Sequence, residues 1–76
     1  PFAETLVVRF NSNENGLAQI RIINVTGKTM LSKQTVISKG SNSIMVDGLK
    51  GLGTGMYVAQ MIMNGNVIDN QKVVKN

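Results

Sequence analysis

Acidic side chains are the first groups in this 76-residue sequence to consider for chemistry, and there are four of them: Glu4, Glu14, Asp47 and Asp69. Hydrolysis of a glycosidic bond needs two carboxyl groups held about 5–10 Å apart. These four are widely separated in the sequence, and each lies in or beside an expected turn or at a strand edge. We therefore interpret them as solvated residues and not as a catalytic pair.

Nucleophilic catalysis and metal binding lack their usual residues, and only the scattered carboxylates are left as metal ligands. The sequence contains no histidine and no cysteine, which excludes the Ser–His and Cys–His pairs that activate a nucleophile. The same absence removes the usual ligands of zinc and any disulfide. We expect a protein that is not an enzyme, with no catalytic residues, no metal site, no cofactor and no small-molecule substrate.

A glycine-rich segment, Gly48–Gly55, resembles a phosphate-binding loop only superficially. Its glycines at 51, 53 and 55 do not match the spacing G-x-G-x-x-G, and no Lys-Ser/Thr pair follows them. We interpret the segment as a compact turn that leads into a strand, with Leu49 and Leu52 folded back over the core.

Tyrosine and methionine are the remaining side chains that could bind a ligand. Tyr57 could stack on a sugar, but it lies at the start of an apolar strand, so we interpret it as a core ring with a hydrogen-bonded hydroxyl. Methionines can form an adaptable binding face. Met56, Met61 and Met63 lie on the same apolar strand, and we interpret all three as core residues.

The charge distribution excludes the usual nucleic-acid binding surface. The net charge is +4, and the eight basic residues are spread singly along the chain. Nucleic-acid binding favours clustered Lys and Arg, often with exposed aromatic rings.

No apolar run approaches the ~18–20 residues that cross a bilayer. The sequence has no signal peptide and begins without methionine, so we expect it to be part of a longer protein.

The composition favours strands over helices. Val and Ile together number 16 residues, against 5 Leu, and there are 8 Gly. Beta-branched side chains fit a pleated sheet, whereas glycine weakens a helix. Period-two alternation between turn signals predicts strands over the following ranges: Glu4–Phe10, Leu17–Val25, Lys28–Ile37, Asn42–Val46, Met56–Met63 and Asn66–Lys75.

Several residues predict local details of these strands. Ile23 breaks the alternation of its strand, which indicates either a bulge or burial on both faces. Gly27 supplies the left-handed position of a type I turn with a bulge, or of a type I′ turn. The polar centre of Lys28–Ile37 indicates either an edge strand or a strand solvated on one side, and the apolar Met56–Met63 indicates a central strand. Asn64-Gly65 predicts a type I′ hairpin.

Six, or at most seven, short strands with turns at regular spacing are typical of an antiparallel sandwich or a small barrel. Several of the turns are long enough to allow Greek-key connections. A length of 76 residues corresponds to a single domain, residues 1–76, near the lower limit for independent folding.

The order of short motifs along the chain resembles a known family. The segments are Pro1-Phe2, Ile22–Lys28 (IINVTGK), Gly40–Val46 (GSNSIMV), Leu49–Tyr57 (LKGLGTGMY) and Lys72–Lys75 (KVVK). Together they resemble the type A C-terminal sorting domain of the type IX secretion system, also called the Por secretion system. The resemblance covers almost the whole chain, and the L-x-x-G-x-Y element and the basic-aliphatic last strand contribute most to it.

The resemblance implies an immunoglobulin-like sandwich at the end of a cargo protein, which acts as a secretion signal. Such domains are recognised in the periplasm and direct the cargo through an outer-membrane translocon to the cell surface or the medium. A sortase-like peptidase typically removes them. The implied partners are therefore the translocon, the sortase-like peptidase and the upstream cargo domain, and dimerisation through an edge strand stays open.

Two sets of residues acquire roles from the resemblance. The recognition segment is the end of the last strand, where unpaired backbone groups could add to a partner's sheet: Lys72, Val73, Val74 and Lys75. The second set shapes the fold: Gly27, Lys28, Leu52, Gly55 and Tyr57.

Two other functions remain open at this point. One is a non-catalytic accessory sandwich of a secreted enzyme, either carbohydrate-binding or fibronectin-like, which predicts an exposed aromatic platform. The other is a structural spacer, whose removal would leave secretion of the cargo intact.

Overall fold

The computed structural model describes residues 4–76, and all of its regular structure in that range is β-strand. The predicted lead-in Pro1-Phe2 lies outside the described residues. No helix long and apolar enough to cross a membrane occurs among residues 4–76. The six strands are β1 (Leu6–Ser12), β2 (Gly16–Ile23), β3 (Thr29–Ile37), β4 (Gly40–Val46), β5 (Gly55–Met63) and β6 (Asn66–Lys75).

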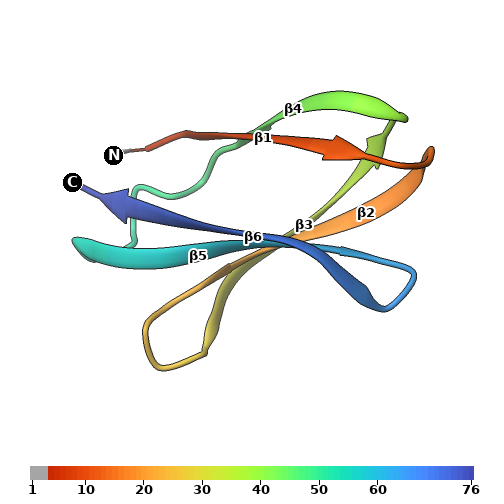
Figure 1. The fold of residues 1–76 in the computed structure, drawn as a ribbon. Coiled ribbons are helices and arrows are strands. Elements are labelled where there is room, and N and C mark those ends of the chain that lie inside the picture. The colour runs from red at the N-terminus through yellow and green to blue at the C-terminus, as the bar shows by residue number, and fades with distance from the viewer. Residues whose placement is uncertain (1–3) are drawn as a thin grey trace.

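The strands form two antiparallel sheets of unequal size (Figure 1). The small sheet pairs β1 with β4, and the large sheet has the order β3-β2-β5-β6. This arrangement confirms an all-β fold of six antiparallel strands in two open sheets and excludes the small barrel. It also confirms β5 as a central strand and β3 as an edge strand, while β6 forms the opposite edge.

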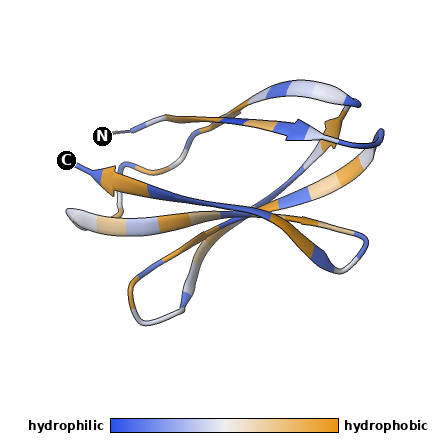
Figure 2. Cartoon of the chain, in the orientation of Figure 1, coloured by the Kyte–Doolittle hydropathy of each residue, from blue (hydrophilic) through white to orange (hydrophobic). Residues whose placement is uncertain are grey.

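The core lies between the two sheets and follows the predicted alternation. Hydrophobic and polar residues alternate along the strands in Figure 2. Ile20 and Ile22 of β2, Val46 of β4 and Leu49 after it are fully buried. The remaining buried apolar side chains of residues 4–76 are Val8, Phe10, Ala18, Ile37, Ile44, Tyr57, Ala59, Met61 and Met63. The core is thus almost entirely aliphatic.

The prediction for Met56 was wrong. Met61 and Met63 are buried in the core, as expected, but Met56 is 49 % exposed. Successive side chains of a strand point to opposite faces, and Met56 is separated from Met61 by an odd number of positions. It therefore lies on the outer face of the large sheet.

The β2–β3 connection is a type I turn followed by a bulge. Gly27 N–H donates to the Asn24 carbonyl at 3.0 Å, Asn24 N–H donates to the Lys28 carbonyl at 2.9 Å, and Gly27 has φ 90°. The Asn24 Oδ1 atom accepts from Thr26 N–H, Thr26 Oγ1–H and Lys28 N–H at 2.7–3.0 Å. The β2–β3 register also shifts between Ile22 and Ile23, because Met30 of β3 has no partner, so the ladder is irregular at Ile23 but the extra residue lies on β3 and not on β2.

The β5–β6 connection is the predicted type I′ hairpin. Both central residues have positive φ, 53° for Asn64 and 78° for Gly65, as this turn requires. The pair Met63↔Asn66 closes the turn, and the register of the ladder shifts between Met61 and Ile62. Ile68 is the extra residue, since Met61 pairs with Asp69 and Ile62 with Val67.

The crossover from β4 to β5 closes one end of the sandwich. Leu49 is fully buried there, and its N–H donates to the Glu4 carbonyl at 3.3 Å. Leu52 packs against the core from the same loop, with its N–H donating to the Leu49 carbonyl at 3.1 Å. Both leucines therefore fold back over the core, as predicted. Strand β1 begins and strand β6 ends at this end of the sandwich (Figure 1).

Two polar side chains bridge the sheets along the open sides of the sandwich. The Gln71 Nε2 atom of β6 donates to the Arg9 carbonyl of β1 at 2.6 Å. The Lys33 Nζ atom of β3 donates to the Met45 carbonyl of β4 at 2.8 Å. Each edge strand of the large sheet thus supplies a donor to the outer backbone edge of the small sheet, which has no strand on that side among the described residues.

Replacement of Leu49, which closes one end of the sandwich, should destabilise the domain. We expect Leu49→Ala to lower the free energy of unfolding by about 2–5 kcal/mol, because a fully buried leucine leaves a cavity when truncated. Denaturation in urea followed by circular dichroism measures the change. The matched control is Leu17→Ala, since Leu17 is 55 % exposed and should change stability by no more than about 0.5 kcal/mol. Equal effects of the two variants would contradict the role of Leu49.

Removal of the Asn24 side-chain acceptor should weaken the β2–β3 turn. We expect Asn24→Ala to cost about 1 kcal/mol, because three donors lose a protein acceptor at an exposed site. Asn24→Asp keeps an acceptor oxygen in the same place and should be close to neutral. The same urea denaturation measures both variants, and an Asp variant as unstable as the Ala variant would refute this account of the turn.

Candidate recognition site

The predicted recognition segment divides between the two faces of β6. Lys72 and Val74 are exposed on the outer face of the large sheet, and Val74 is 45 % exposed. Val73 is half-buried opposite Tyr57, and Lys75 is only 8 % exposed, opposite Gly55. Of these four residues, only Lys72 and Val74 therefore expose their side chains to solvent, while Val73 and Lys75 complete the end of the core.

The backbone of β6 offers a second means of recognition. Among residues 4–76 its only sheet neighbour is β5, and the strand runs for ten residues, Asn66–Lys75. A ladder uses the N–H and C=O groups of alternate residues, so every second residue of an edge strand directs these groups away from its neighbour. The strand contains no proline, and its free edge is able to pair with another strand.

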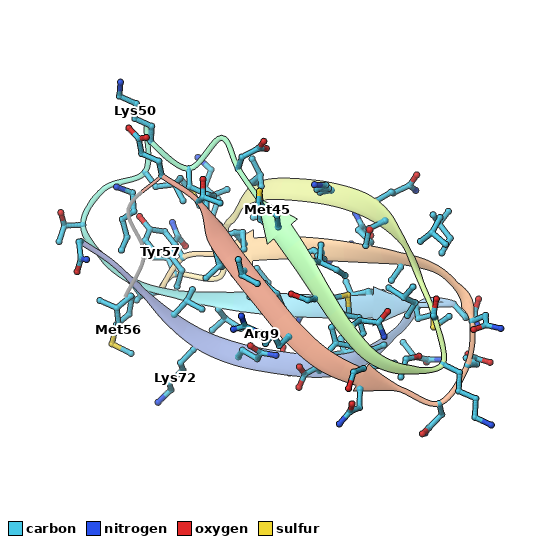
Figure 3. The ribbon with its side chains drawn as sticks, turned by 90° about the horizontal axis from the view of Figure 1, so that it is seen from above. Arg9, Met45, Lys50, Met56, Tyr57 and Lys72 are labelled. Atoms are coloured by element: carbon cyan, nitrogen blue, oxygen red, sulfur yellow. The ribbon has the colours of Figure 1, made fainter. Side chains whose placement is uncertain are left out.

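Apolar side chains surround the exposed part of β6. On the outer face, Val74 pairs with Met56, and Lys72 lies in one row with Val58 and Ile23. Met56 and Lys72 lie side by side at the same edge of the molecule in Figure 3, far from Lys50 on the β4–β5 crossover. This apolar corner is the part of the outer face that adjoins the end of β6.

The outer face of the large sheet carries positive charge only. Its outward-facing strand residues include Arg21 and Lys72, and none of them is acidic. Asp69 belongs to the inward-facing row of β6, because it pairs with the buried Met61. Glu4, Glu14 and Asp47 lie outside the strands of this sheet. The face therefore favours an acidic or neutral partner over a basic one.

A small cavity of about 70 Å³ lies beside Lys72. Most of its lining is apolar, with the polar part supplied by Asn24 and Lys72, and its residues are Ile23, Asn24, Val25, Met56, Tyr57, Val58 and Lys72. The cavity has room for a short aliphatic side chain.

The residues expected to shape the fold lie in the β2–β3 turn, in the β4–β5 crossover and at the start of β5. Gly27 and Lys28 form the β2–β3 turn, and Leu52 packs on the core. Gly55 begins β5 with φ 144°. Tyr57 is 8 % exposed, and its hydroxyl donates to the Gly53 carbonyl at 2.6 Å. The predicted core role of Tyr57 is confirmed, and its ring is not available to stack on a sugar.

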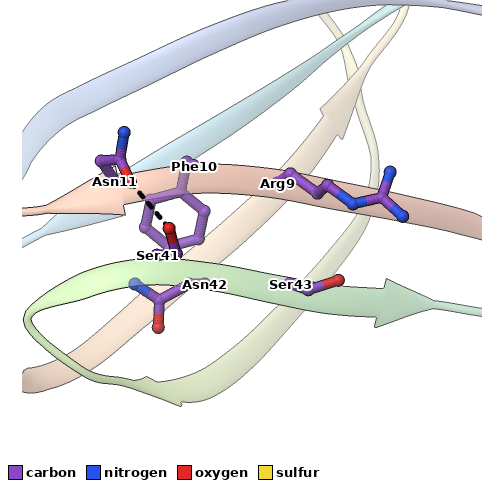
Figure 4. A pocket seen from close by; sticks show the side chains of 6 residues that line it. All are labelled: Arg9, Phe10, Asn11, Ser41, Asn42 and Ser43. Atoms are coloured by element: carbon purple, nitrogen blue, oxygen red, sulfur yellow. Dashed lines mark hydrogen bonds between the residues drawn. The ribbon is translucent and has the colours of Figure 1, made fainter.

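A wider hollow of about 440 Å³ lies over the small sheet (Figure 4). Its lining residues are Arg9, Phe10, Asn11, Ser41, Asn42 and Ser43, and the Ser41 hydroxyl donates to Asn11 Oδ1 at 3.3 Å. The hollow contains one cation, no carboxylate and no exposed ring, because Phe10 is 8 % exposed. It has no pair of groups that could transfer a proton.

Two of the four carboxylates each accept a hydrogen bond from a side-chain amide. Asp69 Oδ2 accepts from Gln71 Nε2 at 2.7 Å, and Glu14 Oε1 accepts from Asn64 Nδ2 at 3.4 Å. No group of three or more acidic side chains that could hold a metal ion occurs among residues 4–76. The most distinctive surface of the described chain is therefore the free edge of β6 with its apolar and cationic surroundings.

Sequence reasoning missed two features of this surface. Met56 was assigned to the core because it shares a strand with Met61 and Met63, although its position in the alternation placed it on the other face. The partial burial of the recognition segment also escaped notice, although Val73 and Val74 are adjacent and must point to opposite faces of a strand.

Comparison with known proteins agrees with these observations. Over residues 1–76 the chain matches the family described as the secretion system C-terminal sorting domain. No curated protein and no solved structure matches it. The match extends over the full length of the sequence, and a domain of this family is a sorting signal and not a catalyst. The chain belongs to the family of C-terminal sorting domains of the type IX secretion system.

Proposed function

We propose that this domain ends a larger cargo protein and directs it across the outer membrane. On this proposal the domain is recognised in the periplasm, passes the cargo to the outer-membrane translocon and is removed by a sortase-like peptidase. The cargo then remains at the cell surface or enters the medium. The family match over all 76 residues carries the proposal, and the free edge of β6 is consistent with a recognition element.

We also propose that the fold is an immunoglobulin-like Greek key. In that sandwich, strands B and E are neighbours in one sheet, and the variable type adds C′ to the G-F-C sheet. The pair β1-β4 corresponds to B and E, and the order β3-β2-β5-β6 corresponds to C′-C-F-G. The bond from the Tyr57 hydroxyl to the Gly53 carbonyl resembles the tyrosine corner at the start of strand F.

The recognition segment is proposed to act through the outward side chains of β6. Val73 and Lys75 are packed at the end of the core, so their replacement would disturb folding as well as recognition. Lys72 and Val74 point to solvent, so their replacement would change recognition without disturbing the core. Recognition would combine their side chains with the backbone of the free edge, as in other cases of strand addition.

A reporter fusion tests the sorting function. Residues 1–76 are fused to the C-terminus of a folded periplasmic reporter in a bacterium that carries a type IX secretion system. We expect the reporter at the cell surface or in the medium, and we expect it in the periplasm in a strain without the translocon. A fusion that stays in the periplasm of the competent strain would refute the proposal, and secretion from both strains would assign the export to another route.

A substitution on the outer face tests the recognition segment within the same fusion. We expect Val74→Asp to reduce export at least about threefold, since a charged side chain replaces an apolar contact of the partner. The matched control is Met45→Asp, because Met45 is 60 % exposed on a strand of the small sheet, away from β6 (Figure 3). Thermal melts by circular dichroism verify that both variants fold. Equal export of the two folded variants would argue against the segment.

A further inference from the structure

The chemistry of the partner strand can be inferred from the residues that it would lie beside. We infer that the free edge of β6 accepts an extended segment of the secretion machinery with an aliphatic and an acidic side chain two positions apart. The inference rests on the proposed function and names what the recognition segment binds. Three observations support it: the outward-facing side chains of β6, the residues of β5 that pair with them, and the positive charge of the outer face of the large sheet.

The first step concerns the side chains that a new strand would meet. Directly opposed residues on neighbouring strands share a face, and their side chains are in contact. A strand beside β6 would therefore continue the row Met56–Val74 and the row Ile23–Val58–Lys72. The first row is apolar, so an aliphatic side chain fits opposite Val74. The second ends in a cation, so a carboxylate fits opposite Lys72.

The second step excludes a partner of the same charge. Asp69 points to the inner face and accepts a hydrogen bond from Gln71 at 2.7 Å. No carboxylate of residues 4–76 lies on the outer face of the large sheet, so none of the strand residues there neutralises Lys72. Like charges directly opposite each other destabilise a sheet, whereas opposite charges stabilise it. A basic strand is therefore disfavoured.

The third step concerns a second copy of this chain. Two antiparallel β6 strands could pair edge to edge, but their outward rows would bring only asparagine, lysine and valine side chains together from Asn70, Lys72 and Val74. Every register leaves Lys72 without an acidic partner, and the symmetric register about Lys72 opposes two lysines. A second copy does not supply the complementary charge, whereas an acidic strand of another protein does.

A peptide pair tests the inference directly on the 76-residue chain. The probes are the blocked heptapeptide Thr-Ile-Thr-Glu-Thr-Ile-Thr and its counterpart with Lys in place of Glu. Their sequences read the same in both directions, so the probe serves for parallel and antiparallel pairing alike. Binding is measured by titration with NMR detection of the backbone amides, which also locates the contact.

We expect the chain to prefer the Glu peptide by about threefold to tenfold, the range that a cross-strand charge pair supports. Amide shifts should concentrate on β6. Lys72→Glu should reverse the preference, and Lys50→Glu should leave it unchanged. Lys50 is the matched control because it is an exposed lysine on the crossover, away from Lys72 (Figure 3). Both variants change the net charge equally.

Four results would overturn the inference. They are no binding of either peptide, equal affinity for both, a preference that Lys72→Glu does not change, and amide shifts confined to residues outside β6. A chain that forms a dimer through β6, measured by light scattering and by shifts that depend on concentration, would assign the edge to a second copy instead.

The test separates this inference from the sorting function. If the reporter fusion is exported but the peptide preference is absent, the partner chemistry is wrong and the sorting function stands. If the preference and its reversal are found but the fusion remains periplasmic, the edge binds acidic strands and the sorting function fails.

Discussion

The structure depends on one constraint: a sheet of two strands must cover the apolar face of a sheet of four. The fully buried side chains lie on β2, β4, β5 and the end of β3, and on the loop residue Leu49. The outer strands of the large sheet extend beyond β1 and β4, so their inward side chains cannot all be apolar. A chain of this length has little surplus hydrophobic burial. The inward-facing positions of the two edge strands therefore require polar side chains with definite partners.

Hydrogen bonds, and not further strands, close the two open sides of the sandwich. Gln71 and Lys33 project inward from the two edge strands of the large sheet and donate to carbonyls of the small sheet. Both bonds lie at exposed sites, and each supplies a donor to a backbone edge that has no strand beside it among residues 4–76. These bridges hold the sheets together at their sides, and Leu49 holds them at one end. The outer face of the large sheet and the free edge of β6 take no part in these contacts between the sheets.

The sequence determined most of the local structure because local rules suffice there. Period-two alternation located the strands, and the bounds of Asn66–Lys75 agree with those observed. The type I′ turn at Asn64-Gly65 and the irregularity near Ile23 were also predictable. The division into two and four strands was not, because it depends on contacts between residues far apart in sequence. Gln71 illustrates the difficulty: its neighbours in sequence resemble a solvated edge, yet its partner is the carbonyl of Arg9. Which side chains of the recognition segment reach solvent was equally hidden.

A single extra residue in β6 determines which of its side chains reach solvent. The hairpin begins with Met63↔Asn66 and Ile62↔Val67, and an uninterrupted ladder would continue to Tyr57↔Lys72. Opposed residues share a face, so Lys72 would then point into the core beside Tyr57, and Val73 would point outward. The bulge at Ile68 shifts the register by one, which reverses the faces of the following residues. Val73 consequently pairs with Tyr57 and Lys72 with Val58. The adjacent apolar residues Val67 and Ile68 are the mark of this shift in the sequence. The bulge thus reconciles two demands on one strand, since it sends a valine to the core and leaves the lysine on the surface.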